Sequence, residues 1–152
     1  MEQPMGKRGF TFIEILVVTI LIGVMMAIMI PKLRGSFDSV NVRAARVAIA
    51  NLIVKARAAA VQRGCTATVT FTSGTTGTMA ISICNVNGSG STTLGGVDSV
   101  AARYKVTLTP SVATLQYDPR GLSVGYTAAT IKVKSNAVTD SVYIDPIGKV
   151  VH

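Results

Sequence analysis

The feature that most constrains this chain is an uninterrupted apolar run near its amino terminus. Residues 10–30 contain a single charged side chain, Glu14, and the basic residues Lys7 and Arg8 lie just before the run. At about 1.5 Å of rise per residue, a helix over these residues is ~31 Å long, which matches a bilayer core of roughly 30 Å. The sequence therefore predicts a membrane-spanning helix with one acid near its start, where a charge is costly and needs a physical reason.

Three simpler explanations of the run account for less of it. A secretory signal peptide has a shorter apolar stretch and an Ala-x-Ala-like cleavage site, whereas this run contains an acid and no such site follows it. A plain membrane anchor explains the length but not Glu14 or the Gly9–Phe10 junction. A buried core helix in a chain of 152 residues is not expected to be apolar on every face.

The junction before the run carries a motif. Residues 9–14 read Gly-Phe-Thr-Phe-Ile-Glu, which resembles the processing site of type IV prepilins and type II secretion pseudopilins, with Phe12 where that family usually has Leu. The resemblance implies that a membrane prepilin peptidase cleaves between Gly9 and Phe10 and that Phe10 is then N-methylated. It also implies other pilin or pseudopilin subunits as partners, and a single pass through the bacterial inner membrane with the domain outside the cytoplasm.

Glu14 is the residue of this run with physical consequences for assembly. It lies four residues after Phe10, so on a helix it faces back toward the positive amine that cleavage creates. In a filament, Glu14 of one subunit would pair with Phe10 of a neighbour, because an unpaired charge in a low-dielectric helix bundle costs several kcal/mol by rough estimate. The alternative places Glu14 among the lipid headgroups, since it is only ~6 Å from Phe10 along the axis.

The helix is expected to continue beyond the membrane. Residues 32–63 are rich in Ala, contain no Pro and end before Gly64, which favours a helix end there. Pro31 is expected to kink the helix, because it removes a backbone donor and crowds the preceding turn. The predicted organisation is a leader over 1–9, a transmembrane assembly helix over 10–30, its amphipathic continuation over 31–63, and an extracytoplasmic β domain over 64–152.

The outer half of this helix is predicted to have one apolar and one basic face. The residues that share the broad apolar face at about 100° per residue are Leu33, Phe37, Val40, Ala44, Ala48 and Ala59. The basic residues that cluster on the opposite side are Lys32, Arg43, Arg46 and Arg57. We expect the apolar face to pack on the strands that follow and the basic face to be solvated.

After Gly64 the patterning changes to that of strands. The predicted strands cover residues 65–71, 79–84, 104–109, 113–117, 130–135, 141–145 and 148–151. The segment 85–96, rich in Gly, Ser and Thr, is expected to be a flexible surface loop. One long helix followed by short strands predicts an α+β class, and with the resemblance a type IV pilin-like fold in which the helix packs on a mainly antiparallel sheet.

The two cysteines, Cys65 and Cys84, lie on the first two predicted strands. If Phe71 pairs with Thr78, an antiparallel register places the cysteines opposite each other, and a disulfide there fits an extracytoplasmic compartment. The alternative is a pair of buried free thiols that behave as small apolar side chains. Spacing alone leaves both interpretations open.

Two turns in the second half share the pattern Asp-Pro-x-Gly, at 118–121 and 145–148. In such a turn the Asp side chain bonds back to the backbone, Pro sets the second position and Gly suits the fourth. The stretches LQYDPRGLS, IKVKS and DSVYIDPIGKV around these turns resemble the carboxy-terminal domain of the GspH/FimT family of minor pseudopilins and minor pilins. Tyr117 stands where that family often has Phe, and its Gly-Trp pair is missing around Met79. The resemblance covers about residues 35–152.

That second resemblance implies a structural subunit of a type II secretion pseudopilus or a type IV pilus, at the filament tip or in its initiation. The residues agree with a role that is not enzymatic. The only histidine is His152, the cysteines lack metal-site spacing, and no phosphate-binding Gly-x-x-x-x-Gly-Lys-Ser/Thr loop is present. We therefore expect no catalytic site, no metal and no cofactor.

A function of a different class follows from the positive charge. The chain has a formal net charge of +8, which would suit a minor pilin that captures DNA for uptake. The candidate DNA contacts are Arg103, Lys105, Arg120, Lys132 and Lys134. No basic loop motif and no aromatic interleaving accompany them, so DNA binding stands as the alternative to the structural role. The sequence does not distinguish a secretion system from a pilus or a competence system.

Overall fold

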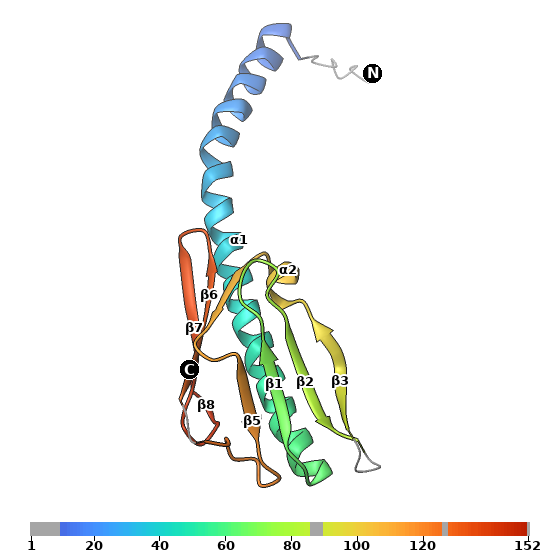
Figure 1. Ribbon diagram of the computed structural model, residues 1–152. Coiled ribbons are helices and arrows are strands. Elements are labelled where there is room, and N and C mark those ends of the chain that lie inside the picture. Colours follow the sequence, from blue (N-terminus) through green and yellow to red (C-terminus); the bar gives the residue numbers. More distant parts are fainter. Residues whose placement is uncertain (1–9, 86–89, 126–127, 152) are drawn as a thin grey trace, which may run out of the picture. The chain divides into compact units, whose positions relative to one another are not determined.

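The structure is a computed structural model that describes residues 10–85, 90–125 and 128–151 (Figure 1). The leader predicted over 1–9 lies outside these residues. The chain divides into two compact units, of which the first ends at Ser36 and the second begins at Phe37.

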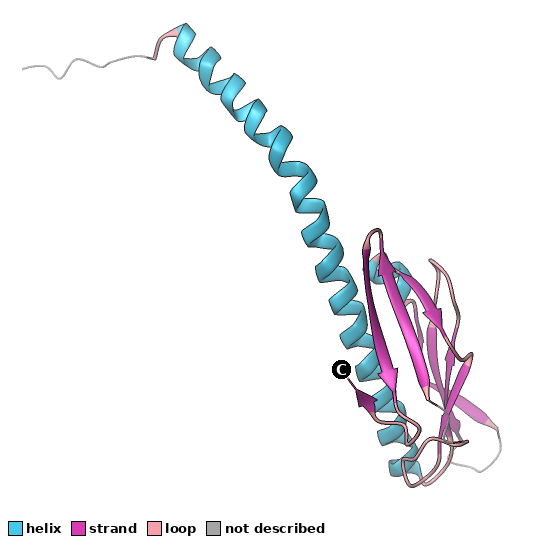
Figure 2. Ribbon diagram, turned by 90° about the vertical axis from the view of Figure 1, so that its left-hand side faces the viewer, coloured by secondary structure: helices cyan, strands magenta, loops and turns pink. Residues whose placement is uncertain are grey.

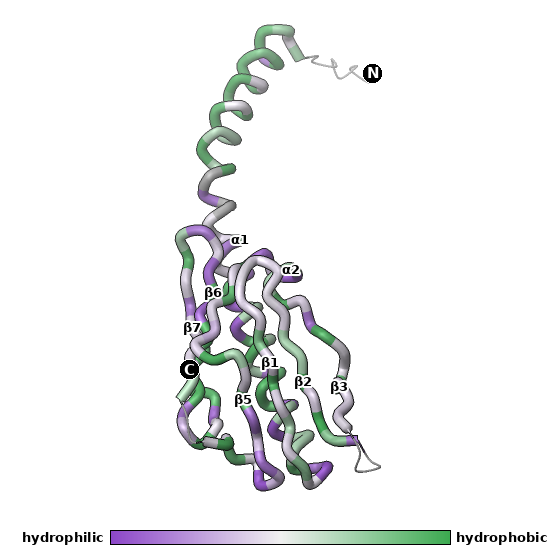
Figure 3. The backbone as a smooth tube through the Cα atoms, viewed as in Figure 1, coloured by the Kyte–Doolittle hydropathy of each residue, from purple (hydrophilic) through white to green (hydrophobic). Residues whose placement is uncertain are grey.

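The first unit is the beginning of helix α1 (Phe12–Arg63). It starts two residues later than predicted, and its large apolar side chains from Phe10 to Ile30 are all exposed. Figure 3 shows this part of α1 in the hydrophobic colour over most of its length. By length and composition α1 is able to cross a membrane, with a mean hydropathy of 2.8 over its most apolar 18 residues. An apolar surface of this extent is stable only in lipid or against other apolar chains.

The second unit contains the rest of α1 and two antiparallel four-stranded sheets. The strands of the first sheet, in the order β3-β2-β1-β5, are β3 (Ser91–Asp98), β2 (Met79–Cys84), β1 (Ala67–Phe71) and β5 (Thr114–Tyr117). Those of the second, in the order β4-β6-β7-β8, are β4 (Thr107–Pro110), β6 (Ala129–Ser135), β7 (Val138–Ile144) and β8 (Val150–Val151). A short helix, α2 (Val100–Tyr104), precedes β4. Both sheets lie on the same side of this part of α1 (Figure 2), and the predicted α+β class is confirmed.

The core forms between the sheets and one stripe of α1. The buried side chains of that stripe recur every three or four residues and are Val42, Ala45, Ile49, Ile53, Ala56 and Ala60. Small Ala side chains let the strands approach the helix closely, while the Ile side chains fill the space between. Alternate residues of β1, β2 and β6 supply the opposite wall of the core. The buried apolar side chains of the described residues all lie between Val42 and Ile144, so this core belongs to the second unit alone.

The prediction of which face of α1 packs on the strands was wrong. Phe37 and Val40, expected in the core, are 64% and 62% exposed, and of the expected set only Ala59 is buried. The side chain of Leu33 lies outside the described ones. The error has a physical reason: this part of the helix carries two apolar stripes roughly opposite each other, and helical periodicity does not say which one faces the sheets.

Two local predictions in the β domain were also wrong. Residues 91–96, expected in a flexible loop, belong to the edge strand β3, and residues 100–104 form α2, so that β4 starts only at Thr107. Most of β3 is exposed, and therefore its sequence lacks the alternation that marks a half-buried strand. Its pairing with β2 shifts register between Ala80 and Ile81, where Gly95 and Gly96, both with positive φ, are left out of the ladder as a bulge.

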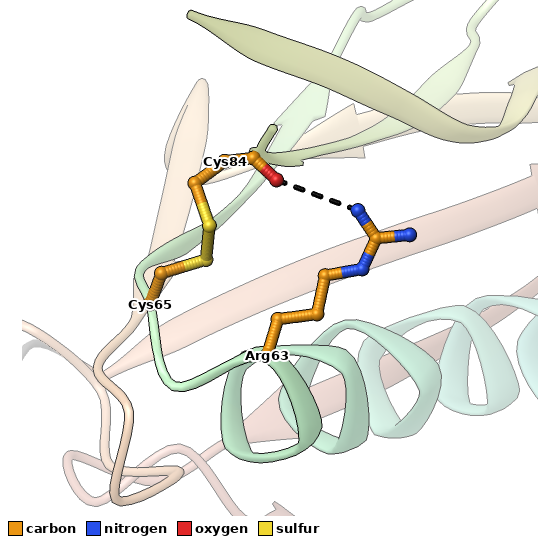
Figure 4. Close-up of a disulfide and its surroundings, with 3 residues drawn as sticks. All are labelled: Arg63, Cys65 and Cys84. Carbon is orange, nitrogen blue, oxygen red and sulfur yellow. Dashed lines mark hydrogen bonds between the residues drawn. A yellow bond between two sulfur atoms is a disulfide. The ribbon is translucent and has the colours of Figure 1, made fainter. Parts of the chain in front are cut away.

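The register of β1 and β2 differs by one residue from the prediction. Phe71 pairs with Met79, not with Thr78, and Cys65 lies two residues before β1 begins. The structure nevertheless joins Cys65 to Cys84 by a disulfide, with the two Cα atoms 6.3 Å apart. The guanidinium of Arg63, the last residue of α1, donates a hydrogen bond to the carbonyl oxygen of Cys84 at 3.4 Å (Figure 4). The end of the helix and the end of β2 are therefore linked twice.

Both Asp-Pro-x-Gly turns form as expected. The Asp118 carboxylate accepts hydrogen bonds from the backbone N–H groups of Arg120 and Leu122 at 2.9 and 2.8 Å. In the second turn Asp145 accepts one from Lys149 at 2.7 Å. The two turns meet through Tyr117, whose buried hydroxyl donates to the Gly148 carbonyl oxygen at 3.0 Å. Burial is the main cause that raises the pKa of Tyr117 to about 12, so this phenol stays neutral and keeps its hydrogen.

Two polar contacts that the sequence did not suggest hold α1 to the β6–β7 hairpin. Arg46 and Asp140 form an ion pair at 2.9 Å, so Arg46 is not on a wholly solvated face as predicted. Burial alone would raise the pKa of Asp140, but the Arg46 hydrogen bond, the Ser141 N–H and nearby positive charge outweigh it and lower that pKa. Asp38 accepts hydrogen bonds from the Ser135 hydroxyl at 3.0 Å and the Asn136 amide at 2.8 Å. These partners are 94 to 98 residues apart in the chain, which is why no local pattern revealed them.

Gly148 is expected to be the glycine of the β domain least tolerant of substitution. Its φ is +85°, and an added Cβ would lie 2.5 Å from Cε1 of Tyr117. Gly148→Ala should lower the free energy of unfolding by about 1–3 kcal/mol more than Gly95→Ala, because overpacking adds to the backbone strain. Gly95 is the matched control, since its φ is +76° and nothing lies within 4 Å of its added Cβ. Urea unfolding in detergent measures both variants, and equal losses would contradict the close contact with Tyr117.

The disulfide should make a measurable contribution to stability. The bonded cysteines are separated by 19 residues, and the chain-entropy relation gives about 3 kcal/mol for closing a loop of that size. Dithiothreitol should therefore lower the free energy of unfolding by about that amount. The double variant Cys65→Ser, Cys84→Ser is the control and should not respond to the reductant. A wild-type protein that is equally stable with and without dithiothreitol would contradict the contribution.

Candidate assembly and processing site

The predicted processing site lies where α1 begins. Gly9 is outside the described residues, and Phe10 is the first residue that the structure places. Phe10 precedes the helix and is 78% exposed. Exposed segments outside regular elements are where cleavage concentrates, so the position suits a processed bond. Cleavage between Gly9 and Phe10 and N-methylation of Phe10 stay predictions.

The first turn of α1 is organised by Thr11 and Glu14. The Thr11 carbonyl oxygen accepts hydrogen bonds from the N–H groups of Glu14 and Ile15 at 3.1 and 3.3 Å, and the Thr11 hydroxyl is 3.4 Å from the Glu14 nitrogen. Thr11 is thus the N-cap, and Glu14 is the third helical residue, where an acid is favoured by the helix dipole. This gives Glu14 a local role in starting the helix that the processing motif does not reveal.

Among the residues that the structure describes, the Glu14 carboxylate has no partner. Neither ion pair found among the described residues involves it, and no described donor reaches its oxygens. The surrounding side chains are apolar and exposed. The described part of the helix start therefore presents one charged group, which no described residue compensates, on an otherwise apolar surface.

The helix continues without interruption in secondary structure across Pro31. Its side chain lies outside those described, and the kink expected at this residue stays a prediction.

The five candidate DNA contacts are not gathered into one site. Arg103, on α2, forms an ion pair with Asp98 at 2.9 Å, which removes it from the set of uncompensated charges. Arg120 lies in the turn after β5, in the other sheet from β6. The structure brings together only the remaining three residues, Lys105, Lys132 and Lys134.

Two of these lysines lie on β6, and Lys105 lies between α2 and β4, the strand that pairs with β6. Lys132 and Lys134 are exposed on the same face of β6, and their cross-strand neighbours are uncharged Thr and Ser residues of β4 and β7. Lys105 has a left-handed backbone with φ of 53°, and its carbonyl oxygen accepts a hydrogen bond from the Ser135 hydroxyl at 3.4 Å. The result is a small positive surface with one exposed aromatic side chain nearby, Tyr143, on the same face of β7. A few lysines and one aromatic ring are little for nucleic-acid recognition.

The described residues offer no group of three or more His, Cys, Asp or Glu side chains that could hold a metal ion. The clefts of the second unit are lined mainly by apolar, amide and basic side chains. The chemically distinctive features of the described chain are therefore the apolar helix, its acid near the start, and surfaces suited to contact with other proteins.

Comparison with known proteins agrees with these features. The family model for type II transport protein GspH matches residues 45–148, and a model of the prokaryotic N-terminal methylation motif matches residues 4–30. No curated protein sequence matches the chain. The fold is similar to that of the type IV minor pilin FimU from Pseudomonas aeruginosa (strain PAO1) in two crystal forms. The P21 form has a TM-score of 0.59 and 17% identity over 72% of this chain and 86% of that chain. The P65 form has a TM-score of 0.57 and 16% identity over 72% and 90%.

The GspH match covers more than half of the 152 residues and includes most strands of both sheets, while the methylation motif covers the apolar run with Gly9, Phe10 and Glu14. The chain therefore belongs to the GspH family of minor pilins and pseudopilins, which are structural subunits and not enzymes.

Proposed function

We propose that this chain is a minor subunit of a type II secretion pseudopilus or a type IV pilus, which enters the filament through the first half of α1 and acts at the tip or in initiation. The observation that carries the proposal is Glu14, which pairs with no described residue, on the exposed apolar helix. Before assembly this helix would be anchored in the inner membrane, with the disulfide-bonded β domain on the outer side.

The exposed apolar side chains of the helix must be shielded from water both before and after assembly, by different surroundings. In the membrane, lipid covers the side chains from Phe10 to Ile30. In a filament, the helices of neighbouring subunits replace the lipid. Both surroundings are apolar, so the free energy of Val, Ile, Leu, Met and Phe side chains changes little on transfer from lipid to the filament. The free energy of the charged group therefore determines which axial position of the helix is favoured.

Glu14 and the processed amino terminus supply complementary charges. Cleavage after Gly9 would leave a positive amine on Phe10, and N-methylation would keep that charge. In a helix bundle, each carboxylate would be stabilised by the amine of an adjacent subunit, because an unpaired charge there costs several kcal/mol by rough estimate. The pair sets the axial register of one subunit against the next.

Replacement of Glu14 should separate assembly from anchoring. Glu14→Leu should reach the membrane and be cleaved normally, but its amount in sheared filaments should fall at least tenfold, which corresponds to a loss of about 1.4 kcal/mol. Thr11→Ala is the matched control, since it removes the hydroxyl of the N-cap and keeps the charge. It should assemble at near wild-type levels. Immunoblots of filament and membrane fractions, with amino-terminal mass spectrometry for cleavage, measure the effect.

Wild-type incorporation of Glu14→Leu would contradict the charge pairing. Equal loss in Thr11→Ala would assign the effect to the start of the helix instead. An intact Met1 in cells with active prepilin peptidase would contradict the processing step.

One observation favours the alternative that the chain binds DNA, namely the positive surface formed by Lys105, Lys132 and Lys134, in which the cross-strand neighbours of Lys132 and Lys134 are uncharged. If that surface binds DNA, Lys132→Ala with Lys134→Ala should abolish the gel shift of the detergent-solubilised chain, whereas Arg103→Ala should not, because Arg103 is already paired with Asp98. Binding should weaken steeply as the salt concentration rises from about 50 to about 200 mM, because bound DNA releases its counterions. We expect no shift at low salt, and a salt-sensitive shift lost in the double variant would favour DNA capture.

A further inference from the structure

The second half of α1 carries an apolar stripe that the β domain does not use. Its positions alternate in steps of three and four residues, which is the heptad spacing of a helix that packs along another helix. We name this stripe the α1 seam. It consists of Phe37, Val40, Ala44, Val47, Asn51, Val54, Ala58 and Val61.

The α1 seam faces away from the core. Val40, Val47, Val54 and Val61, at seven-residue intervals, are 62%, 51%, 56% and 52% exposed. The core stripe from Val42 to Ala60 lies about 180° away around the helix axis, at 100° per residue. A row of half-exposed Val side chains over about three heptads is not required by the fold, since none of them enters its core. Exposed apolar surface of this extent marks an interaction site.

Clefts flank the α1 seam on both sides. The larger, of about 660 Å³, is lined on one side by Ala44 and Val47 of the seam and also by Leu52, Arg103 and Tyr104. The smaller, of about 240 Å³, lies on the other side of Val54 and reaches the turn at Gly148 and Lys149. The seam is therefore a ridge between two clefts, a shape that suits the apolar edge and flanking side chains of a second helix.

The charges beside the α1 seam have one sign. The positions that flank a heptad seam include Arg43, Lys55 and Arg57 and contain no acid. Asp98, which lines the larger cleft, is already in an ion pair with Arg103. Asp38 accepts hydrogen bonds from Ser135 and Asn136. A helix that docks here thus meets an apolar ridge bordered by Arg43, Lys55 and Arg57, none of which forms an ion pair with a described residue. Asp140 interacts with the charge of Arg43 but is itself paired with Arg46.

We infer that the α1 seam binds an amphipathic helix of a different subunit, with an apolar stripe of its own bordered by Asp or Glu. A second copy of this chain fits poorly, because its flanking positions are also basic and supply no carboxylate in any register. The inference rests on the proposed function, since it adds to the filament contact made by the first half of α1 a contact that selects a particular neighbour. Charge at flanking positions sets partner choice more than it sets affinity.

Photo-crosslinking in the native host tests the partner. Benzoylphenylalanine at Val47 or Val54 of the full chain should give a crosslinked product with a different subunit. Peptide mass spectrometry should locate the crosslink in an acidic helix of that subunit. The matched controls are Val97 and Val124, which are 63% and 49% exposed but lie outside the seam. They should give no such product. Crosslinks mainly to a second copy, equal crosslinks from the controls, or no crosslink from the seam would each overturn the inference.

Reversing the charges beside the α1 seam tests whether they select the partner helix. Arg43→Glu with Lys55→Glu should lower the yield of the Val47 crosslink about fivefold or more, because attractive flanking pairs become repulsive. The control Arg43→Lys with Lys55→Arg keeps the charges and should keep the yield. An unchanged yield after reversal would overturn the charge selection. Filament incorporation is measured in the same cells: a chain that is incorporated without seam crosslinks contradicts only this inference, whereas a chain that is never incorporated contradicts the proposed function as well.

Discussion

Burial of one stripe of α1 beneath both sheets is the interaction on which the second unit depends. Neither sheet has a core of its own: β1 and β2 in one sheet and β6 in the other turn their alternate apolar residues toward the helix. Val42, Ile49 and Ile53 are almost completely buried in return. Other links, such as the disulfide, the Arg46–Asp140 pair and the Tyr117 hydrogen bond, act at the edges of this packing. They fix where the strands begin and end on the helix, while the apolar contact supplies most of the driving force.

The predictable parts of this architecture are those whose residue pattern lies within one continuous segment of the sequence. The apolar run, the helix end at Arg63, the half-buried strands β1, β2 and β6 and the Asp-Pro-x-Gly turns each follow from spacing within one segment. The edge strand β3 could not be predicted, because it pairs through its backbone and leaves its small side chains exposed. The Asp38 contacts with the hairpin could not be predicted either, since they join residues 97 and 98 positions apart.

The candidate site divides in the same way. Gly9, Phe10 and Glu14 could be proposed from the sequence because their motif is local, whereas the cap that Thr11 makes for the first turn became evident only from the structure of the helix start. The basic candidate DNA contacts were interpreted as one set because the sequence shows which residues are charged but not which residues lie next to them in the fold. In the fold, Asp98 compensates Arg103, and Asp140 compensates Arg46, which had been assigned to a solvated stripe. The mistake over the faces of α1 has a related cause, since two opposite apolar stripes give the same periodicity.

A single helix thus has three apolar surfaces: the run from Phe10 to Ile30, the core stripe, and the α1 seam. Apolar contacts are not directional, so apolar residues alone cannot keep these surfaces from exchanging partners. The charges beside them differ. The first surface carries one acid, the second is closed over by the sheets, and the third is bordered by Arg43, Lys55 and Arg57. A partner suited to the first surface must bring a positive group, and one suited to the third must bring negative groups. Different partners can therefore occupy the same helix without competing, because a few charges specify which apolar surface each one covers.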